Sequence, residues 1–307
     1  MSQSAEVQVN RESFILDAGT LENGEPLYIR GEVRIAHGRE GERSEEDAES
    51  AGVRLPVLII SHGFKGFKDW GFFPYVAERF ASRGFYTVTF NFSCNGVNER
   101  DFDELDKFAV NTYSREQQDL KLLLGAVKAG SLPFGEYADA GRIHLLGHSR
   151  GGGNSILAAA EHPEIRSVTT WNGNANPDLF DDAFKERIAQ DGVAYVANAR
   201  TKQEMPIRAV FYEDLRLHGE RYDIARRLQE IEAPVLQVQG DQDSPRLKAG
   251  FETLRQASPR HAKAIVTIEG GNHTFGAVHP FQGTTPYLEQ ALEATLSFLE
   301  NNQKVTY

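Results

Sequence analysis

The chain has 307 residues, of which 40% are hydrophobic and 25% charged, as in an ordinary globular protein. Its formal net charge of −11 argues against a nucleic-acid or membrane partner, because both bind basic surfaces. The single cysteine, Cys94, allows no intrachain disulfide and no cysteine-based metal site. Residues 1–10 lack the apolar run of a signal peptide, and no segment is apolar enough to span a bilayer. We therefore expect a cytoplasmic protein.

The first fifty residues divide into a strand-rich part and a polar part. Short alternating runs in residues 7–35 flank a turn at 22–25 and predict antiparallel edge strands joined by a hairpin. Residues 37–53 are the most polar and charged stretch of the chain. We interpret them as a long, solvated acidic loop, with an acidic functional tract as the alternative.

From residue 57 onward, apolar runs alternate with amphipathic segments. The run at 57–60 is continuously apolar, as expected of a parallel strand buried on both faces, and further strands are predicted over 85–90, 142–146, 168–171, 234–239 and 264–268. Between and after them, helices are predicted over 74–83, 114–127, 152–160, 246–256 and 287–300. Repeated strand–helix units predict a mostly parallel sheet covered by helices.

Residues 172–232 interrupt this alternation. They are polar and irregular, with helix-like pieces over 180–190 and 222–229. We interpret the segment as an insertion over the sheet, within a single domain that spans residues 1–307.

The segment Gly147-His148-Ser149-Arg150-Gly151 joins a predicted strand to a predicted helix. It fits the G-x-S-x-G nucleophile elbow, in which a serine occupies a sharp turn and the outer glycines avoid collisions with the neighbouring strand and helix. A plain glycine-rich turn is the alternative. The segment lacks the glycine and lysine pattern of a phosphate-binding loop. Ser149 is therefore the candidate nucleophile.

A serine hydroxyl needs an adjacent base, which a third group holds in place. Functional groups in open parallel sheets collect beyond the carboxyl ends of the strands. Asp241 and Asp243 follow the fifth predicted strand, and we select Asp243; turn formation or helix capping is the alternative for both. His273, in a glycine-rich loop after the sixth strand, is the candidate base, and His279 is the weaker one.

The loop after the first parallel strand begins Ser61-His62-Gly63-Phe64-Lys65. Acyl transfer requires donors for the oxyanion, and the backbone N–H groups of Phe64 and Arg150 are candidates. We expect His62 to hold the loop by hydrogen bonding. Lys65 and Lys68 are interpreted as solvated, with an anionic substrate group as the alternative.

Two further kinds of site are not supported by the sequence. Cys94 follows a strand but lacks an elbow around it, so we do not expect it to be a nucleophile. No His, Asp or Glu cluster has metal-ligand spacing, so no metal is predicted.

These motifs resemble the α/β-hydrolase superfamily from about Val57 to the C-terminus, including its Ser, Asp, His order along the chain. Within it, the chain is similar to serine esterases of the feruloyl/cinnamoyl-esterase and dienelactone-hydrolase-like group. The resemblance rests on His62-Gly63-Phe64, Phe90-Asn91-Phe92, Asn95-Gly96, the elbow, Gly240-Asp241-Gln242-Asp243 and Gly271-Asn272-His273-Thr274-Phe275. It implies an α/β-hydrolase fold, a Ser149–Asp243–His273 triad, an oxyanion hole at Phe64 and Arg150, and a small cap formed by residues 172–232.

The leading hypothesis is a serine esterase that needs no cofactor and acts on a small-molecule ester. The alternatives are the same triad acting on a thioester, lactone or short peptide, and a catalytically silent binding protein. Dienelactone hydrolases proper use cysteine as the nucleophile, whereas this chain has Ser149. The cap aromatics either line an apolar pocket or form the cap's own core; they are Phe180, Phe184, Tyr195, Phe211, Tyr212 and Tyr222. Oligomeric state is not predicted.

Overall fold

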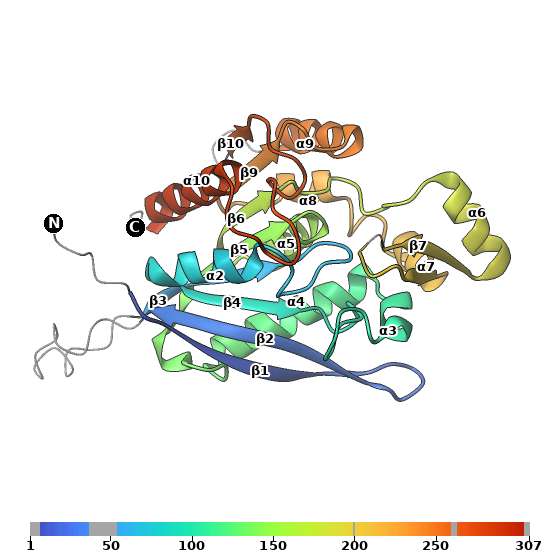
Figure 1. The fold of residues 1–307 in the computed structure, drawn as a ribbon, viewed down its shortest axis with the longest axis horizontal. Helices are drawn as coiled ribbons and strands as arrows, with labels where there is room; N and C mark the ends of the chain where they lie inside the picture. Colours follow the sequence, from blue (N-terminus) through green and yellow to red (C-terminus); the bar gives the residue numbers. More distant parts are fainter. Residues whose placement is uncertain (1–6, 37–53, 199, 259–262, 304–307) are drawn as a thin grey trace, which may run out of the picture.

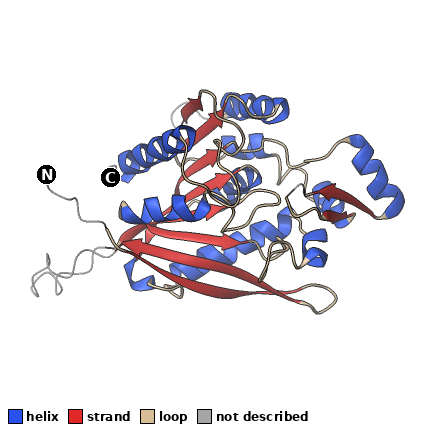
Figure 2. Cartoon of the chain, viewed as in Figure 1, coloured by secondary structure: helices blue, strands red, loops and turns tan. Residues whose placement is uncertain are grey.

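An eight-stranded sheet is the centre of the computed structural model, which describes residues 7–36, 54–198, 200–258 and 263–303 (Figures 1 and 2). The strand order is β1-β2-β4-β3-β5-β6-β9-β10. The strands are β1 (Val9–Thr20), β2 (Pro26–Ala36), β3 (Leu55–Ser61), β4 (Tyr86–Asn91), β5 (Ala138–His148), β6 (Ile165–Trp171), β9 (Val235–Gly240) and β10 (Lys263–Ile268). The acidic loop predicted over 37–53 lies outside the described residues.

The sheet is mixed, as the two kinds of sequence pattern predict. β1 pairs antiparallel with β2, and β2 pairs antiparallel with β4. From β4 to β10 every neighbouring pair of strands is parallel. The predicted hairpin is confirmed, although two short runs expected near residues 9 and 15 form the single strand β1. The structure thus confirms a mostly parallel sheet with antiparallel structure at one edge.

Each face of the sheet carries an apolar core under its helices. Successive residues of β3 point to opposite faces, so Val57 and Ile59 belong to one core and Leu58 and Ile60 to the other. One core includes residues of α4 (Tyr113–Lys128), α5 (Arg150–Glu161) and α9 (Pro245–Ala257). The other includes residues of α2 (Phe73–Ser82) and α10 (Pro286–Gln303). Burial on both faces explains why β3 is continuously apolar from Val57 to Ile60.

The insertion between β6 and β9 contains more regular structure than its sequence predicts. Its elements are α6 (Asp182–Asp191), β7 (Val193–Ala197), β8 (Glu204–Arg208), α7 (Val210–Leu217) and α8 (Ile224–Gln229). β7 and β8 pair antiparallel as a separate two-stranded sheet that was not predicted, because five-residue strands give a weak alternation signal. In Figure 1, α6, α7 and β7 extend beyond the central sheet. α8 instead returns to α5, where Ile224 lies beside Gly153.

The segment between β4 and α4 contains one short helix, α3 (Leu105–Ala109), that was also not predicted. Among the helices of the described residues, none combines the length and apolarity that a membrane-spanning helix requires. The carboxyl ends of β3, β5, β6, β9 and β10 meet at one edge of the sheet, because these strands are parallel. The predicted functional loops all leave from this edge.

Candidate active site

Ser149 occupies the sharp turn between β5 and α5. Its backbone angles are φ 55° and ψ −120°, a conformation that non-glycine residues rarely adopt. A Cβ added to Gly147 would lie 2.1 Å from the carbonyl oxygen of Gly151, and one added to Gly151 would lie 2.4 Å from that of Ser61. The Ser149 N–H donates a hydrogen bond to the Trp171 oxygen at 2.9 Å. Both glycines are therefore required by close packing, as the elbow pattern predicts.

The loop after β3 lies directly against this serine. A Cβ on Gly63 would lie 2.8 Å from the Ser149 Cβ, so only glycine allows this approach. The Gly66 N–H donates to the Gly63 oxygen at 3.0 Å and closes a tight turn around Phe64. The structure therefore brings the candidate oxyanion loop and the candidate nucleophile together.

His62 holds this loop from the inside, as predicted. Its Nδ1 lies 2.9 Å from the Gly63 oxygen, and the Phe92 N–H donates to its Nε2 at 3.3 Å. These partners require the tautomer with the proton on Nδ1. Burial lowers the pKa of His62 to about 4, so the ring is neutral at physiological pH.

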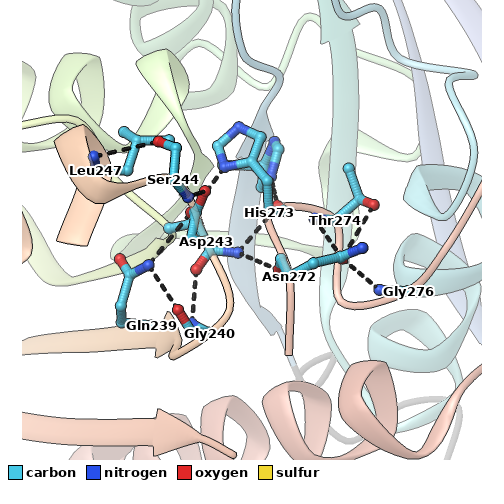
Figure 3. Close-up of polar contacts among 11 residues, drawn as sticks. Gln239, Gly240, Asp243, Ser244, Leu247, Asn272, His273, Thr274 and Gly276 are labelled. Atoms are coloured by element: carbon cyan, nitrogen blue, oxygen red, sulfur yellow. Dashed lines mark hydrogen bonds and ion pairs between the residues drawn. The ribbon is translucent and has the colours of Figure 1, made fainter. Parts of the chain in front are cut away.

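Asp243 and His273 form the clearest polar pair of the site (Figure 3). The distance between Asp243 Oδ2 and His273 Nδ1 is 2.9 Å, and the Asp243 side chain is 1% exposed. The Ser244 N–H also donates to Asp243, at 2.6 Å, and the Gln239 amide donates at 3.2 Å. Burial would raise the pKa of Asp243, but these hydrogen bonds and the imidazole hold it below its ordinary value. Asp243 is thus an anion that orients the ring.

The alternative acid and base have other partners. Asp241 accepts the Gly270 N–H at 2.8 Å and joins the loops after β9 and β10. His279 accepts the Gly71 N–H at its Nδ1, also at 2.8 Å, and stacks on Trp70. The preference for Asp243 over Asp241 therefore agrees with the hydrogen bonding of His273.

Asn172 contributes to the site, although its place in the sequence indicates only the start of the insertion. It follows β6 in a left-handed conformation with φ 49°. Its Oδ1 accepts the Gly240 N–H at 2.8 Å, and its Nδ2 donates to the His273 oxygen at 2.9 Å. One side chain therefore connects the acid-bearing loop to the base-bearing loop. An asparagine directly after a buried parallel strand is the signal that could have revealed it.

His148 supports the same loop from the elbow. Its ring is buried, and its Nε2 lies 2.7 Å from the His273 oxygen, so it donates there. Burial, followed by the neighbouring His273, lowers the pKa of His148 to about 3. A neutral His148 therefore holds the backbone of His273 without adding charge to the site.

The Arg150 side chain turns into the protein core. Its Nε donates to Glu116 at 2.7 Å, and both side chains are less than 5% exposed. Its guanidinium carbon lies 4.1 Å from the centre of the Tyr113 ring. Asn154 also donates to Glu116, at 2.6 Å. This buried ion pair between α4 and α5 was missed because it depends on two helices meeting.

Ser149 and His273 line one cavity of about 500 Å³, which is within the usual size of small-molecule sites. The other lining residues are Gly63, Phe64, Lys65, Gly66, Trp70, Phe73, His148, Asn198, Arg200, Thr274, Ala277, Val278 and His279. A larger, more polar hollow of about 670 Å³ beside α3 includes none of the candidate catalytic groups. The smaller cavity is therefore the candidate active site.

The cap aromatics and Lys68 lie outside the cavity lining. Phe180 stacks on Phe184, Phe211 and Tyr222 are buried in the core shared with α4, and Tyr195 is exposed. The prediction that Lys68 is solvated is wrong, because the loop folds onto β2 and its ammonium group pairs with Glu32 at 2.9 Å.

Cys94 is fully buried, and burial raises the pKa of its thiol to about 12, which agrees with the expectation that it is not a nucleophile. Within the described ranges, no three His, Cys, Asp or Glu side chains gather as metal ligands do.

Comparisons with known proteins identify the fold. The α/β hydrolase GrgF from Penicillium sp. sh18 superposes with a TM-score of 0.67 at 16% identity, covering 95% of this chain and 99% of that one. Est1E from Butyrivibrio proteoclasticus, solved with ferulic acid bound, gives 0.64 at 18% identity over 90% and 96%. A dienelactone hydrolase from Anabaena variabilis gives 0.55 at 16% identity over 95% and 98%.

This chain has the α/β-hydrolase fold. Its mostly parallel sheet, flanking helices and strand-to-helix elbow agree with the expectation drawn from the sequence. No family model matches the chain. A curated relative, the uncharacterized 31.7 kDa protein of the traX-finO intergenic region of Escherichia coli, is 25% identical over 128 residues. That match spans 42% of this chain and 41% of the relative.

Proposed function

We propose that this α/β-hydrolase-fold chain is a serine hydrolase that cleaves carboxylic esters through an acyl-enzyme intermediate. The observation that carries the proposal is the 2.9 Å contact between Asp243 and His273, in a cavity that Ser149 also lines. A histidine that a buried carboxylate holds at Nδ1 presents Nε2 as a base. Ser149, at the apex of a strained elbow, is the nucleophile that such a base activates.

The proposed reaction begins when Ser149 Oγ attacks the ester carbonyl carbon and His273 accepts the hydroxyl proton. Asp243 keeps the imidazole oriented and stabilises its positive charge. The backbone N–H groups of Phe64 and Arg150 stabilise the oxyanion. His273 then protonates the leaving alcohol, and a water molecule, activated by the same base, releases the acid and regenerates Ser149.

The surroundings of these groups support their roles. Gly63 packs against Ser149, and the following residue, Phe64, lines the same cavity. The Arg150 side chain is held by Glu116 in the core, so the role proposed for this residue needs only its backbone. The reaction uses groups of the chain and water, and the proposal therefore includes no cofactor.

The same groups would also cleave a thioester, a lactone or a short amide, because all share the acyl chemistry. Esters are preferred here as the substrate class because the solved neighbours include an enzyme with ferulic acid bound and a dienelactone hydrolase. A silent binding protein is the remaining alternative, and it gives no reason for the buried Asp243 carboxylate to hold His273.

The test is turnover of a short-chain p-nitrophenyl ester by the wild type and by Ser149→Ala. We expect the substitution to reduce kcat roughly ten-thousand-fold or more. Ser131→Ala, which removes an exposed hydroxyl, is the matched control and should retain full activity. A fluorophosphonate probe should label the wild type and Ser131→Ala but not Ser149→Ala. Full activity in Ser149→Ala would overturn the mechanism, and an unlabelled, inactive wild type would favour the binding protein.

A further inference from the structure

The cavity around Ser149 has an asymmetric charge distribution. Two of its lining residues, Lys65 and Arg200, are cationic, and no described residue of the lining is an aspartate or a glutamate. Trp70 and Phe73 contribute apolar surface, and Asn198 from the insertion adds an amide. An apolar cavity with a few convergent polar groups is typical of a specific small-molecule site.

The charge of Arg200 is already balanced. Its guanidinium group contacts the Asp101 carboxylate at 2.5 Å. His279 Nε2 lies 3.7 Å from the same carboxylate. Burial, followed by Arg200, lowers the pKa of His279 and favours its neutral form. Neither residue therefore leaves an uncompensated positive charge in the cavity.

Lys65 differs from its neighbours. Its Nζ donates to the Ala197 carbonyl oxygen at 3.2 Å, and no carboxylate of the described residues lies within ion-pair distance of it. Lys68, on the same loop, is paired with both Glu32 and Asp69. The Lys65 side chain is half-buried, and burial lowers the pKa of its ammonium group. One loop thus carries a paired lysine outside the cavity lining and an unpaired lysine within it.

A partly desolvated cation without a counter-ion is stabilised when a ligand supplies a negative charge. Lys65 and Ser149 line the same cavity, so a ligand that fills it reaches both the proposed nucleophile and the ammonium group. We propose that the site takes esters that also carry a carboxylate, with Lys65 binding that carboxylate. This inference rests on the proposed esterase function and narrows it to anionic esters, such as half-esters of dicarboxylic acids.

The experiment compares anionic and neutral esters of matched shape. Mono-p-nitrophenyl adipate carries a carboxylate on the acyl side, and p-nitrophenyl hexanoate lacks it. 4-Acetoxybenzoate carries a carboxylate on the alcohol side, and its methyl ester replaces that charge with a neutral group. The measured quantity is the ratio of kcat/KM for the anionic ester to that for the neutral one, after subtraction of enzyme-free hydrolysis. A charge-assisted hydrogen bond predicts a ratio of about 10 to 100 in one of the two pairs.

Three variants test whether Lys65 causes the preference for the anionic ester. Lys65→Met should reduce it about tenfold or more, and Lys65→Arg should retain most of it, because the positive charge is kept. Lys121→Met removes an exposed lysine of α4 with the same change in net charge, and it should leave the ratio unchanged. Added salt should lower the wild-type ratio.

The outcomes separate this inference from the proposed function. Turnover of the neutral esters with no preference for the anionic ones would overturn the inference and leave the esterase proposal intact. A preference that survives in Lys65→Met would also overturn it. Turnover of neither class by the folded wild type would overturn both proposals.

Discussion

Ser149 has a backbone conformation that costs an isolated L-residue about 1–3 kcal/mol. Its surroundings impose this conformation, since Gly147 and Gly151 pack against neighbouring backbone and the Ser149 N–H is bonded to Trp171. The strained turn therefore requires glycine at both positions, because the neighbouring backbone leaves no room for a Cβ methyl group. The pattern Gly-x-Ser-x-Gly can be recognised in the sequence because this crowding is local and requires glycine at fixed positions around Ser149.

We predict that Gly151→Ala destabilises the protein and removes activity. The new Cβ would lie 2.4 Å from the Ser61 oxygen and 2.6 Å from that of His62, so backbone has to move. We expect a loss of about 2–3 kcal/mol or more in the free energy of unfolding, measured by urea denaturation. The matched control is Gly125→Ala in α4, where a Cβ meets nothing within 4 Å. The higher helix propensity of alanine should raise the free energy of unfolding of this control by about 1 kcal/mol at most. Equal effects in the two variants would contradict this account.

Asn172 offers a second test at the level of a single residue. Asn172→Gly keeps the left-handed backbone accessible but removes the hydrogen bonds to Gly240 and His273. We expect kcat for a p-nitrophenyl ester to fall about tenfold or more, because the loops that carry the acid and the base lose their connection. Asn302→Gly, near the end of α10, is the control. Unchanged kcat in a folded Asn172→Gly would show that the two loops keep their positions without the Asn172 side chain.

At the level of elements, the insertion packs on the loop that carries the proposed oxyanion donor. The Phe64 ring lies 5.7 Å from that of Phe180 in the insertion and 5.5 Å from that of Phe108 in α3. Lys65 donates to the Ala197 carbonyl of β7. Two neighbouring residues of the loop are therefore held from outside, while His62 holds it from inside. The insertion thus contributes to positioning as well as to the cavity wall.

Phe180→Ala should therefore lower kcat more than it changes KM. Loss of the ring leaves Phe64 with one aromatic neighbour fewer, and a shift of the N–H donor weakens oxyanion stabilisation. We expect a decrease of about tenfold in kcat, measured with a small p-nitrophenyl ester. Tyr195→Ala is the control, because that side chain lies in β7 and is 52% exposed. A rise in KM alone would assign Phe180 to substrate binding instead.

The whole molecule buries several titratable groups that couple its stability to pH. Burial lowers the pKa of His62, His144 and His148 to about 4, 4 and 3. As pH falls through 6.5, these histidines bind protons in the unfolded chain but stay neutral in the folded chain, so the free energy of unfolding decreases. Asp119 acts in the opposite direction, because burial raises its pKa to about 7 and the folded chain then binds a proton that the unfolded chain releases.

These four groups together give a net difference of about two protons between roughly pH 6 and 4.5, so their contribution to the free energy of unfolding should fall by about 2–3 kcal/mol per pH unit. Urea denaturation at about pH 6, 5.5, 5 and 4.5 measures this slope. His144→Gln removes one contributor whose Nδ1 contacts Ser167, and it should lower the slope by about 1.4 kcal/mol per pH unit. A pH-independent stability, or an unchanged slope in His144→Gln, would contradict the assignment.

The parallel strands, the elbow and the hairpin were predictable because each depends on residues close together in the sequence. Val57 to Ile60 are apolar at every position because both faces of β3 are covered. The loops that bear Asp243 and His273 could be ranked because parallel strands end at one edge. The β7–β8 pair and α3 were missed because strands and helices of five residues have almost no periodicity to read.

Local pattern alone therefore identified the fold, the candidate nucleophile and the loops from which its partners come. Tertiary structure decided how charged and polar side chains are paired, because pairing depends on segments far apart in the sequence. It joined Arg150 to Glu116, linked two loops through Asn172 and placed Lys68 on Glu32. It also left Lys65 without a carboxylate partner among the described residues, in the cavity that Ser149 lines. No short motif encodes the presence or absence of such a distant counter-ion.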